Sequence, residues 1–304
     1  MQKNELVSRY EQAAAILPSR LRKAALAVSD GEKAAAEELR LRAGRPLTVL
    51  LPGGEAALDA EVEPEELETL CDIATEFSRY AAAETIREGF LPVRGGFRVG
   101  LCGTAVMKDG INTNLKNLSS AVIRIARERR GVAEGIAPKL FQNGGFLSTL
   151  ILSPPGGGKT TLLRDLVRCL SEGGPEHPPQ RISLIDERGE VAVVCRGAPQ
   201  MDVGPRTDVL DACPKSLGVP IVLRAMNPQI IAVDEITVRE DLAAMSLATG
   251  CGVGLLATIH AADVPELLRK PLYRQLLEQQ VFRLAVRILR NGDGRVYALE
   301  ELPC

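Results

Sequence analysis

Residues 150–170 read LILSPPGGGKTTLLRDLVRCL, and this stretch decides the class of fold. An apolar run leads into three consecutive glycines, a Lys-Thr pair and a segment whose leucines recur at helical spacing. Glycines let backbone N–H groups converge on phosphate oxygens, because no Cβ blocks the approach. The order of strand, glycine-rich turn and helix therefore predicts a phosphate-binding loop at the N-terminus of a helix.

The residues of this loop have separate expected roles. Lys159 would place its charge on the β- and γ-phosphates of ATP, and the Thr160 hydroxyl would hold Mg²⁺. The full pattern GxxxxGK[ST] has glycine where this chain has Ser153, but the amides that hold the anion lie further along. We expect the nucleotide to be bound by Ser153, Pro154, Pro155, Gly156, Gly157, Gly158, Lys159, Thr160 and Thr161.

The segment NPQIIAVDEI (227–236) places two carboxylates directly after an apolar strand. Open α/β sheets bind ligands at the C-terminal ends of their strands, so we expect these carboxylates to face the phosphate loop. Asp234 would hold Mg²⁺ through water, and Glu235 would orient or deprotonate the attacking water. Such a pair is also a common helix cap, but the phosphate loop upstream favours the catalytic interpretation.

Two further strand ends carry polar side chains. LIDERGE ends a strand at Asp186 and Glu187, and GLLATIHA ends one at Thr258 and His260. A charged turn would explain the first, and a capping or buried histidine the second. We expect a catalytic role for Glu187, and we expect His260 to sense the γ-phosphate because its strand follows the one that carries the two carboxylates.

From Phe146 onward, continuous apolar runs alternate with helical patterns, which is typical of a mostly parallel sheet covered by helices. The strand candidates are 146–152, 182–186, 230–234, 254–259 and 284–289. We expect an α/β domain over 138–304, a smaller α+β domain over 1–110, and a linker strand and hinge over 111–137.

The N-terminal part has shorter and more varied patterns. They predict a helix from Glu5 to Val28 broken at Pro18, two strands joined at Ala43-Gly44, a helix that starts at Pro64, a second helix around 79–88, a glycine-rich hairpin over 90–106, and a strand over 118–127.

The composition of the 304 residues excludes several functional classes. A hydrophobic content of 45% with 25% charged residues is that of a globular protein. The formal net charge of -2 gives no general attraction to nucleic acid or anionic lipid, and an aromatic content of 3% disfavours stacking platforms for single strands.

The seven cysteines include no CxxC pair, so we expect neither a disulfide framework nor a zinc site, and a reduced cytosolic protein. No apolar run approaches the length that spans a bilayer, so any membrane association would be peripheral.

Four segments resemble, in order, the sequence boxes of the secretion ATPases of type II, type IV and pilus machines. They are SPPGGGKT for the phosphate loop, IDERGE for the acidic box, NPQIIAVDEI for Walker B and ATIHA for the histidine box. Other segments resemble one branch of that superfamily, the stage III sporulation protein AA family, over nearly the whole chain. They are LRLRAGRPL, SRYAAAETIREGFLPVRGGFRVGLCG, SSAVIRIARE, LIDERGEV and GPRTDVLDACPK.

The resemblance implies a RecA-like P-loop NTPase core with a smaller α+β N-terminal domain, and Mg²⁺-dependent ATP hydrolysis by a homo-hexamer. It implies membrane proteins of a sporulation channel as partners, no nucleic acid, and a cytoplasmic location on the mother-cell membrane around the forespore. Arginines of the linker and N-terminal domain would reach the γ-phosphate. Arg98 and Arg124 fall in the matching segments, although an interdomain salt bridge would also explain Arg124, and Arg188 adjoins the acidic box.

Two alternatives stay open. One is a nucleic-acid-dependent P-loop ATPase of the plastid type, whose Arg-x-x-x-His module does not follow the ATPase segments in this chain. The other is a nucleotide switch that closes on ATP and rarely hydrolyses it, against which the presence of Glu235 argues.

Overall fold

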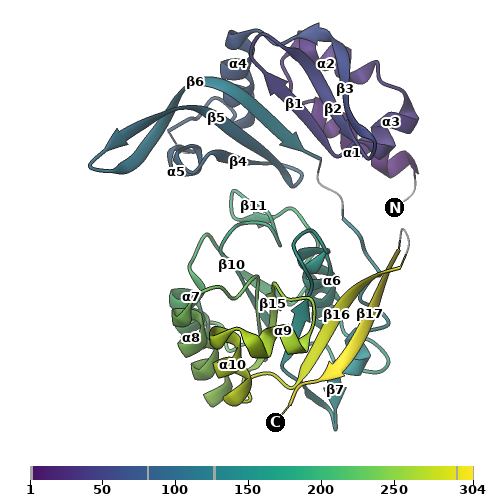
Figure 1. Cartoon of the computed structure of the whole chain (residues 1–304), viewed down its shortest axis with the longest axis vertical. Coiled ribbons are helices and arrows are strands. Elements are labelled where there is room, and N and C mark those ends of the chain that lie inside the picture. Colours follow the sequence, from purple (N-terminus) through teal and green to yellow (C-terminus); the bar gives the residue numbers. More distant parts are fainter. Residues whose placement is uncertain (1–2, 81, 126–127, 292–293, 304) are drawn as a thin grey trace. The chain divides into compact units, whose positions relative to one another are not determined.

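The computed structural model describes residues 3–80, 82–125, 128–291 and 294–303, and the chain divides into two compact units. The first unit comprises Met1–Glu128 and Val193–Gln200. The second unit comprises Arg129–Ala192 and Met201–Cys304. The expected order of a smaller α+β part followed by an α/β part is confirmed by the two sheets described below (Figure 1).

The first unit begins with three short helices, α1 (Lys3–Ala14), α2 (Ser19–Leu26) and α3 (Asp30–Ala35). Pro18 separates the first two because it is the N-cap of α2 and cannot continue α1. Ser29 begins α3 with a capping box, since its hydroxyl accepts the Glu32 N–H and the Glu32 carboxylate accepts the Ser29 N–H.

The sheet of the first unit has six antiparallel strands in the order β3-β2-β1-β6-β5-β4. The strands are β1 (Glu38–Arg42), β2 (Pro46–Leu51), β3 (Gly54–Glu61), β4 (Phe90–Val93), β5 (Phe97–Lys108) and β6 (Ile111–Arg124). Helices α4 (Pro64–Ala74) and α5 (Ala83–Arg87) lie between β3 and β4 in the chain.

Residues 111–124, which the sequence assigned to a linker, form β6 in the middle of this sheet. Ile123 is opposite Leu39 of β1 on one side and opposite Val99 of β5 on the other. The alternation of apolar residues fills the core of the first unit, where Ile123 has no exposed surface. The first unit therefore extends past residue 110, and the last two residues of the strand expected over 118–127 lie outside the described residues.

The second unit is built on a seven-stranded sheet in the order β13-β10-β14-β15-β9-β16-β17. All neighbouring pairs are parallel except β16 and β17, which form an antiparallel hairpin. The strands are β9 (Thr149–Leu152), β10 (Ile182–Asp186), β13 (Thr207–Asp211), β14 (Ile230–Val233), β15 (Gly254–Ile259), β16 (Leu284–Asn291) and β17 (Gly294–Glu301).

Helices cover both faces of this sheet, so the central strands are buried. One core cluster joins the strands to apolar side chains of α7 (Lys215–Ala225), α8 (Arg239–Gly250), α9 (Val264–Arg269) and α10 (Pro271–Glu278). Helix α6 (Lys159–Glu172) packs on the other face, against β9, β10, β13 and β15. None of the described helices is long and apolar enough to cross a bilayer.

The remaining elements are short. A 3-10 helix spans Ala137–Leu140, and two small hairpins are formed by β7 (Phe141–Gln142) with β8 (Gly145–Phe146) and by β11 (Val194–Cys195) with β12 (Ala198–Pro199).

This topology positions the candidate site. Strands β10, β14, β15 and β9 are consecutive in the sheet and parallel to one another. Their C-terminal ends therefore lie along one edge of the sheet. The segments that leave this edge are the phosphate loop after β9, the acidic pairs after β10 and β14, and the histidine segment after β15.

Tyr10 offers a test of the first unit's core, because its buried hydroxyl donates a hydrogen bond to the Ala25 carbonyl at 3.0 Å. We expect Tyr10→Phe to lower the free energy of unfolding by about 1 kcal/mol, since the buried hydrogen bond from the tyrosine hydroxyl is lost. Denaturant titration followed by circular dichroism measures this. Tyr80→Phe is the matched control, because Tyr80 is 96% exposed. Equal midpoints for the two variants would contradict the assigned role of Tyr10.

Candidate nucleotide-binding site

The turn between β9 and α6 requires glycine for steric reasons. Gly156 and Gly158 have φ values of +69° and +101°, in the region that side chains disfavour. A Cβ at Gly157 would lie 1.6 Å from the Ser153 hydroxyl oxygen, so the turn closes only with glycine there. Gly158 is the N-cap of α6, and no described side chain caps that end, so its first N–H groups can receive an anion.

Lys159 is the first residue of α6 and is only 7% exposed. Its ammonium donates to the carbonyls of Ser153 at 2.9 Å and Pro154 at 3.3 Å, and its third neighbour is His260 Nδ1 at 2.6 Å. Burial lowers the pKa of Lys159, while the negative charges of Glu235 and Asp234 oppose that shift.

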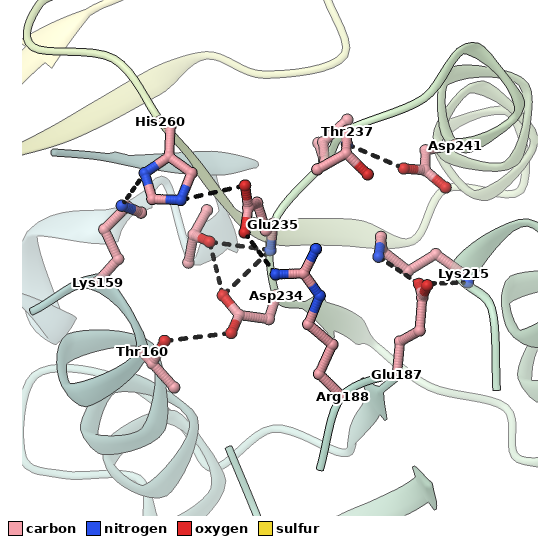
Figure 2. A network of polar contacts seen from close by, with 12 residues as sticks. Lys159, Thr160, Glu187, Arg188, Lys215, Asp234, Glu235, Thr237, Asp241 and His260 are labelled. Carbon is pink, nitrogen blue, oxygen red and sulfur yellow. Dashed lines mark hydrogen bonds and ion pairs between the residues drawn. The ribbon is translucent and has the colours of Figure 1, made fainter. Parts of the chain in front are cut away.

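The contacts of His260 fix its tautomer (Figure 2). An ammonium can only donate, so Nδ1 accepts from Lys159 and the proton of the neutral ring sits on Nε2. That nitrogen lies 3.1 Å from Glu235 Oε1 and donates to it. His260 therefore links the lysine of the phosphate loop to the carboxylate after β14.

Asp234 joins three elements of the second unit. Its Oδ2 accepts from the Thr160 hydroxyl of α6 at 3.1 Å, and its Oδ1 accepts from the Thr258 hydroxyl of β15 at 2.7 Å. The Thr258 hydroxyl in turn accepts the Glu235 N–H at 2.9 Å. This arrangement fixes Asp234 beside the start of α6.

Glu235 has a backbone φ of +23°, which a residue with a side chain rarely adopts. Its backbone N–H donates hydrogen bonds to the Thr258 hydroxyl and to Asp234 Oδ1, the latter at 3.1 Å. These hydrogen bonds hold the unusual conformation. The carboxylate is directed to His260 on one side and to Arg188 Nη1, at 3.1 Å, on the other. Figure 2 shows both contacts.

Glu187, for which the sequence predicted a catalytic role, lies apart from this network. It forms an ion pair with Lys215 of α7. Burial alone would raise the pKa of Glu187, but the hydrogen bond from Lys215 lowers it below its usual value. Of the acidic box, Arg188 is the residue whose side chain reaches Glu235 (Figure 2).

Asp186 stabilises the turn that follows β10. Its buried carboxylate accepts N–H groups of Glu190, Val191 and Ala192 at 2.8 to 3.2 Å. Burial nevertheless raises the pKa of Asp186. The backbone contacts orient the segment that carries Arg188.

Arg98 and Arg124 belong to the sheet of the first unit. The Arg98 guanidinium lies over the ring of Phe90, 4.1 Å from its centroid. Arg124 Nε is 3.6 Å from a Glu38 carboxylate oxygen, and its side chain is 65% exposed. Contact of either arginine with a nucleotide stays a prediction.

Two oxygen donors of the site fit Mg²⁺. Among the described residues there is no cluster of three or more His, Cys, Asp or Glu side chains that could hold a metal ion. The Thr160 hydroxyl and the Asp234 carboxylate nevertheless face each other at 3.1 Å. Mg²⁺ prefers hard oxygen ligands and is commonly held by one or two protein groups together with phosphate oxygens, so this pair suits it when a nucleotide supplies the rest.

Sequence reasoning identified Thr258 only as the end of a strand, and the structure gives it a clear role. The threonine has no exposed surface, yet it connects two loop carboxylate residues through its hydroxyl. A polar side chain within the apolar run GLLATI was the available signal, because a buried hydroxyl needs a polar partner.

Known proteins resemble this chain in sequence and in fold. The family model described as "Sporulation stage III, protein AA" matches residues 7–300. The chain is 36% identical over 286 residues to stage III sporulation protein AA of Bacillus subtilis (strain 168), which covers 94% of this chain and 93% of that protein.

Solved structures show the same fold. The pilus retraction motor PilT with bound ADP aligns with a TM-score of 0.58 at 17% identity, over 88% of this chain and 80% of that one. The ATPase DotB of Legionella pneumophila aligns with a TM-score of 0.55 at 17% identity, over 87% and 76% of the two chains.

Thr258 can be tested without an activity assay. Thr258→Val keeps the shape but removes the buried hydroxyl that accepts the Glu235 N–H and donates to Asp234 Oδ1, so we expect a loss of about 2 kcal/mol in the free energy of unfolding. Thr258→Ser keeps the hydroxyl and should lose less. Chemical denaturation of both variants measures the difference. A valine variant as stable as the serine variant would show that the hydroxyl does not hold this turn.

Asp211 provides a pH-dependent test at the end of β13. It lies opposite Asp186 in the parallel register, and burial together with the Asp186 charge raises its pKa to about 6. A carboxyl group whose folded-state pKa is raised stabilises the fold at low pH and loses that contribution as pH rises toward the folded value. The melting temperature of Asp211→Asn, relative to that of wild type, should therefore increase as the pH rises from 4 to about 6.5.

Thermal melts at several pH values check this expectation, with Asp208→Asn on the same strand as the control, because Asp208 lies opposite Ser183 rather than opposite a carboxylate. A constant difference between Asp211→Asn and wild type across that range would contradict it.

Proposed function

Because the chain belongs to the sporulation stage III protein AA family, we propose that it binds ATP and hydrolyses it to ADP and phosphate. The observation that carries the proposal is the convergence of Lys159, Thr160, Asp234, Glu235 and His260 at the strand ends of the second unit. The shared fold with PilT and DotB supports it.

Binding would use the open N–H groups at the start of α6 and the Lys159 ammonium. The carbonyls of Ser153 and Pro154 and His260 Nδ1 are neutral acceptors for that ammonium. Phosphate oxygens carry negative charge and form stronger, charge-assisted hydrogen bonds. A polyphosphate chain can therefore displace these acceptors, and the segment Ser153–Thr161 would surround it.

Hydrolysis would depend on Glu235. A water molecule beside its carboxylate would attack the γ-phosphorus, the bond from that phosphorus to the β-phosphate oxygen would break, and the water proton would pass to Glu235. His260 and Arg188 orient the two carboxylate oxygens. Lys159 would stabilise the charge that develops on the transferred group.

Mg²⁺, held by Thr160 and Asp234, would neutralise charge on the β- and γ-phosphates. The role of Asp234 would then be to fix the Thr160 hydroxyl and the metal on the same side of the loop, as its contacts with Thr160 and Thr258 favour.

We further propose a biological setting from the family membership. The protein would form a homo-hexamer, associate peripherally with membrane proteins of a sporulation channel on the cytoplasmic side of the mother-cell membrane around the forespore, and energise or assemble that channel. Arg98 and Arg124 would approach the γ-phosphate in the closed assembly, where their charge would stabilise the transition state.

We expect measurable phosphate release by the full chain with Mg²⁺ and ATP. Lys159→Ala and Glu235→Gln should each lower kcat at least about 100-fold, since each removes a group that acts on the transferred phosphate. Glu240→Gln, at an exposed position on α8, is the matched control and should keep wild-type turnover.

The assay is repeated with and without single-stranded DNA. Strong stimulation by DNA would favour the nucleic-acid-dependent alternative. Tight ATP binding with no turnover in any condition would favour a nucleotide switch. Wild-type turnover in Glu235→Gln would contradict the proposed mechanism.

A further inference from the structure

Arg295 of β17 lies beside the phosphate loop, although it is far from that loop in the sequence. Strand β16 pairs in parallel with β9, with Arg287 opposite Leu152. β17 pairs with β16, with Arg295 opposite Arg290. The phosphate loop leaves β9 directly after Leu152, and β16 continues past that point to Asn291, so the start of β17 lies level with the loop. Figure 1 shows β16 and β17 side by side.

The close approach is visible at Gly158. The position that a Cβ of Gly158 would occupy lies 2.9 Å from Arg295 Cζ, 3.0 Å from Nε and 3.1 Å from Nη1. The guanidinium therefore covers Gly158, the N-cap of α6. Glycine at this position serves two purposes, because it permits the φ of +101° and leaves room for the arginine.

The charge of Arg295 has no anionic partner within the described part of the chain. The side chain is partly buried, but no ion pair or hydrogen bond of its guanidinium is found there. Arg287 on the neighbouring strand, in contrast, pairs with Glu300 at 2.9 Å. The buried carboxylate of Asp165 in α6 accepts from Arg168 and from the Ala133 N–H instead. A guanidinium that offers five donors beside an anion-binding turn is suited to phosphate.

The sheet order indicates which part of the nucleotide would meet Arg295. β15 and β14 lie on one side of β9, and they carry His260 and Glu235 at their ends. The γ-phosphate must lie on that side, because the attacking water needs Glu235. β16 and β17 lie on the other side of β9. The end of the phosphate chain that is attached to the nucleoside would therefore lie toward Arg295.

We infer that Arg295 binds the α-phosphate of the nucleotide and thereby completes the site on the side opposite the catalytic carboxylate. The inference rests on the proposed nucleotide-binding function. Because the α-phosphate is present in ATP and ADP alike and does not react, the contact strengthens binding of both nucleotides equally and leaves the chemical step unchanged.

The test uses the full chain with Arg295→Gln, Arg295→Lys and the control Arg283→Gln, at an exposed position beside the opposite end of β16. Affinities for ADP and for ATP are measured by displacement of a fluorescent nucleotide, and kcat by phosphate release at saturating ATP. Arg295→Gln should weaken both affinities about tenfold, with kcat within about twofold of wild type. Arg295→Lys, which keeps the charge but not the planar fork, should lose less.

The outcomes separate the two proposals. If wild type binds no nucleotide, the proposed function fails and this inference with it. If wild type binds and hydrolyses ATP while Arg295→Gln matches Arg283→Gln in both affinities, only the inference is overturned. A fall in kcat with unchanged affinities would also overturn it, because Arg295 would then act on the transition state. Melting curves confirm folding, and the lysine variant supplies the comparison if the glutamine variant does not fold.

Discussion

The buried ammonium of Lys159 is the constraint around which the second unit is organised. A charge that is only 7% exposed needs acceptors on every side, and the glycine-rich turn supplies two carbonyls while β15 supplies His260. His260 in turn donates to the Glu235 carboxylate, and that carboxylate also pairs with the Arg188 guanidinium. Hydrogen-bond donors and acceptors therefore alternate across the ends of four strands, and the sheet order places these groups within hydrogen-bonding distance.

The same network explains why an unusual backbone persists at Glu235, for which we propose the catalytic role. Glu235 adopts a φ of +23°, which the hydroxyl of Thr258 and the carboxylate of Asp234 compensate by accepting its N–H. The strained residue is thus the one whose carboxylate must be aimed most accurately. Thr160 shares Asp234 with this turn, so the start of α6 and the end of β14 are positioned together.

Much of the second unit could be predicted from the sequence, because buried parallel strands appear as continuous apolar runs between turn residues. β10 and β15 have the predicted bounds, and the phosphate loop and the carboxylates of Asp234 and Glu235 lie where strand ends place ligands. The assignment of 111–124 to a linker failed, because alternation shows that a strand has a buried face but not which sheet receives it. Local pattern also could not show that Arg188, rather than Glu187, turns toward Glu235, since Lys215 on a distant helix draws Glu187 away. The position of Arg295 beside the phosphate loop depends on the register of the β16–β17 hairpin, and the sequence did not predict it.

The central claim is that the turn before α6, with Lys159, holds a polyphosphate chain. Isothermal titration calorimetry of the full chain with a nonhydrolysable ATP analogue at millimolar Mg²⁺ tests it most directly, with Lys159→Met as the comparison. The account predicts saturable binding heat at one site per chain for wild type and its loss in the variant. Absence of binding heat in wild type at high protein concentration, or equal heat in both proteins, would contradict it.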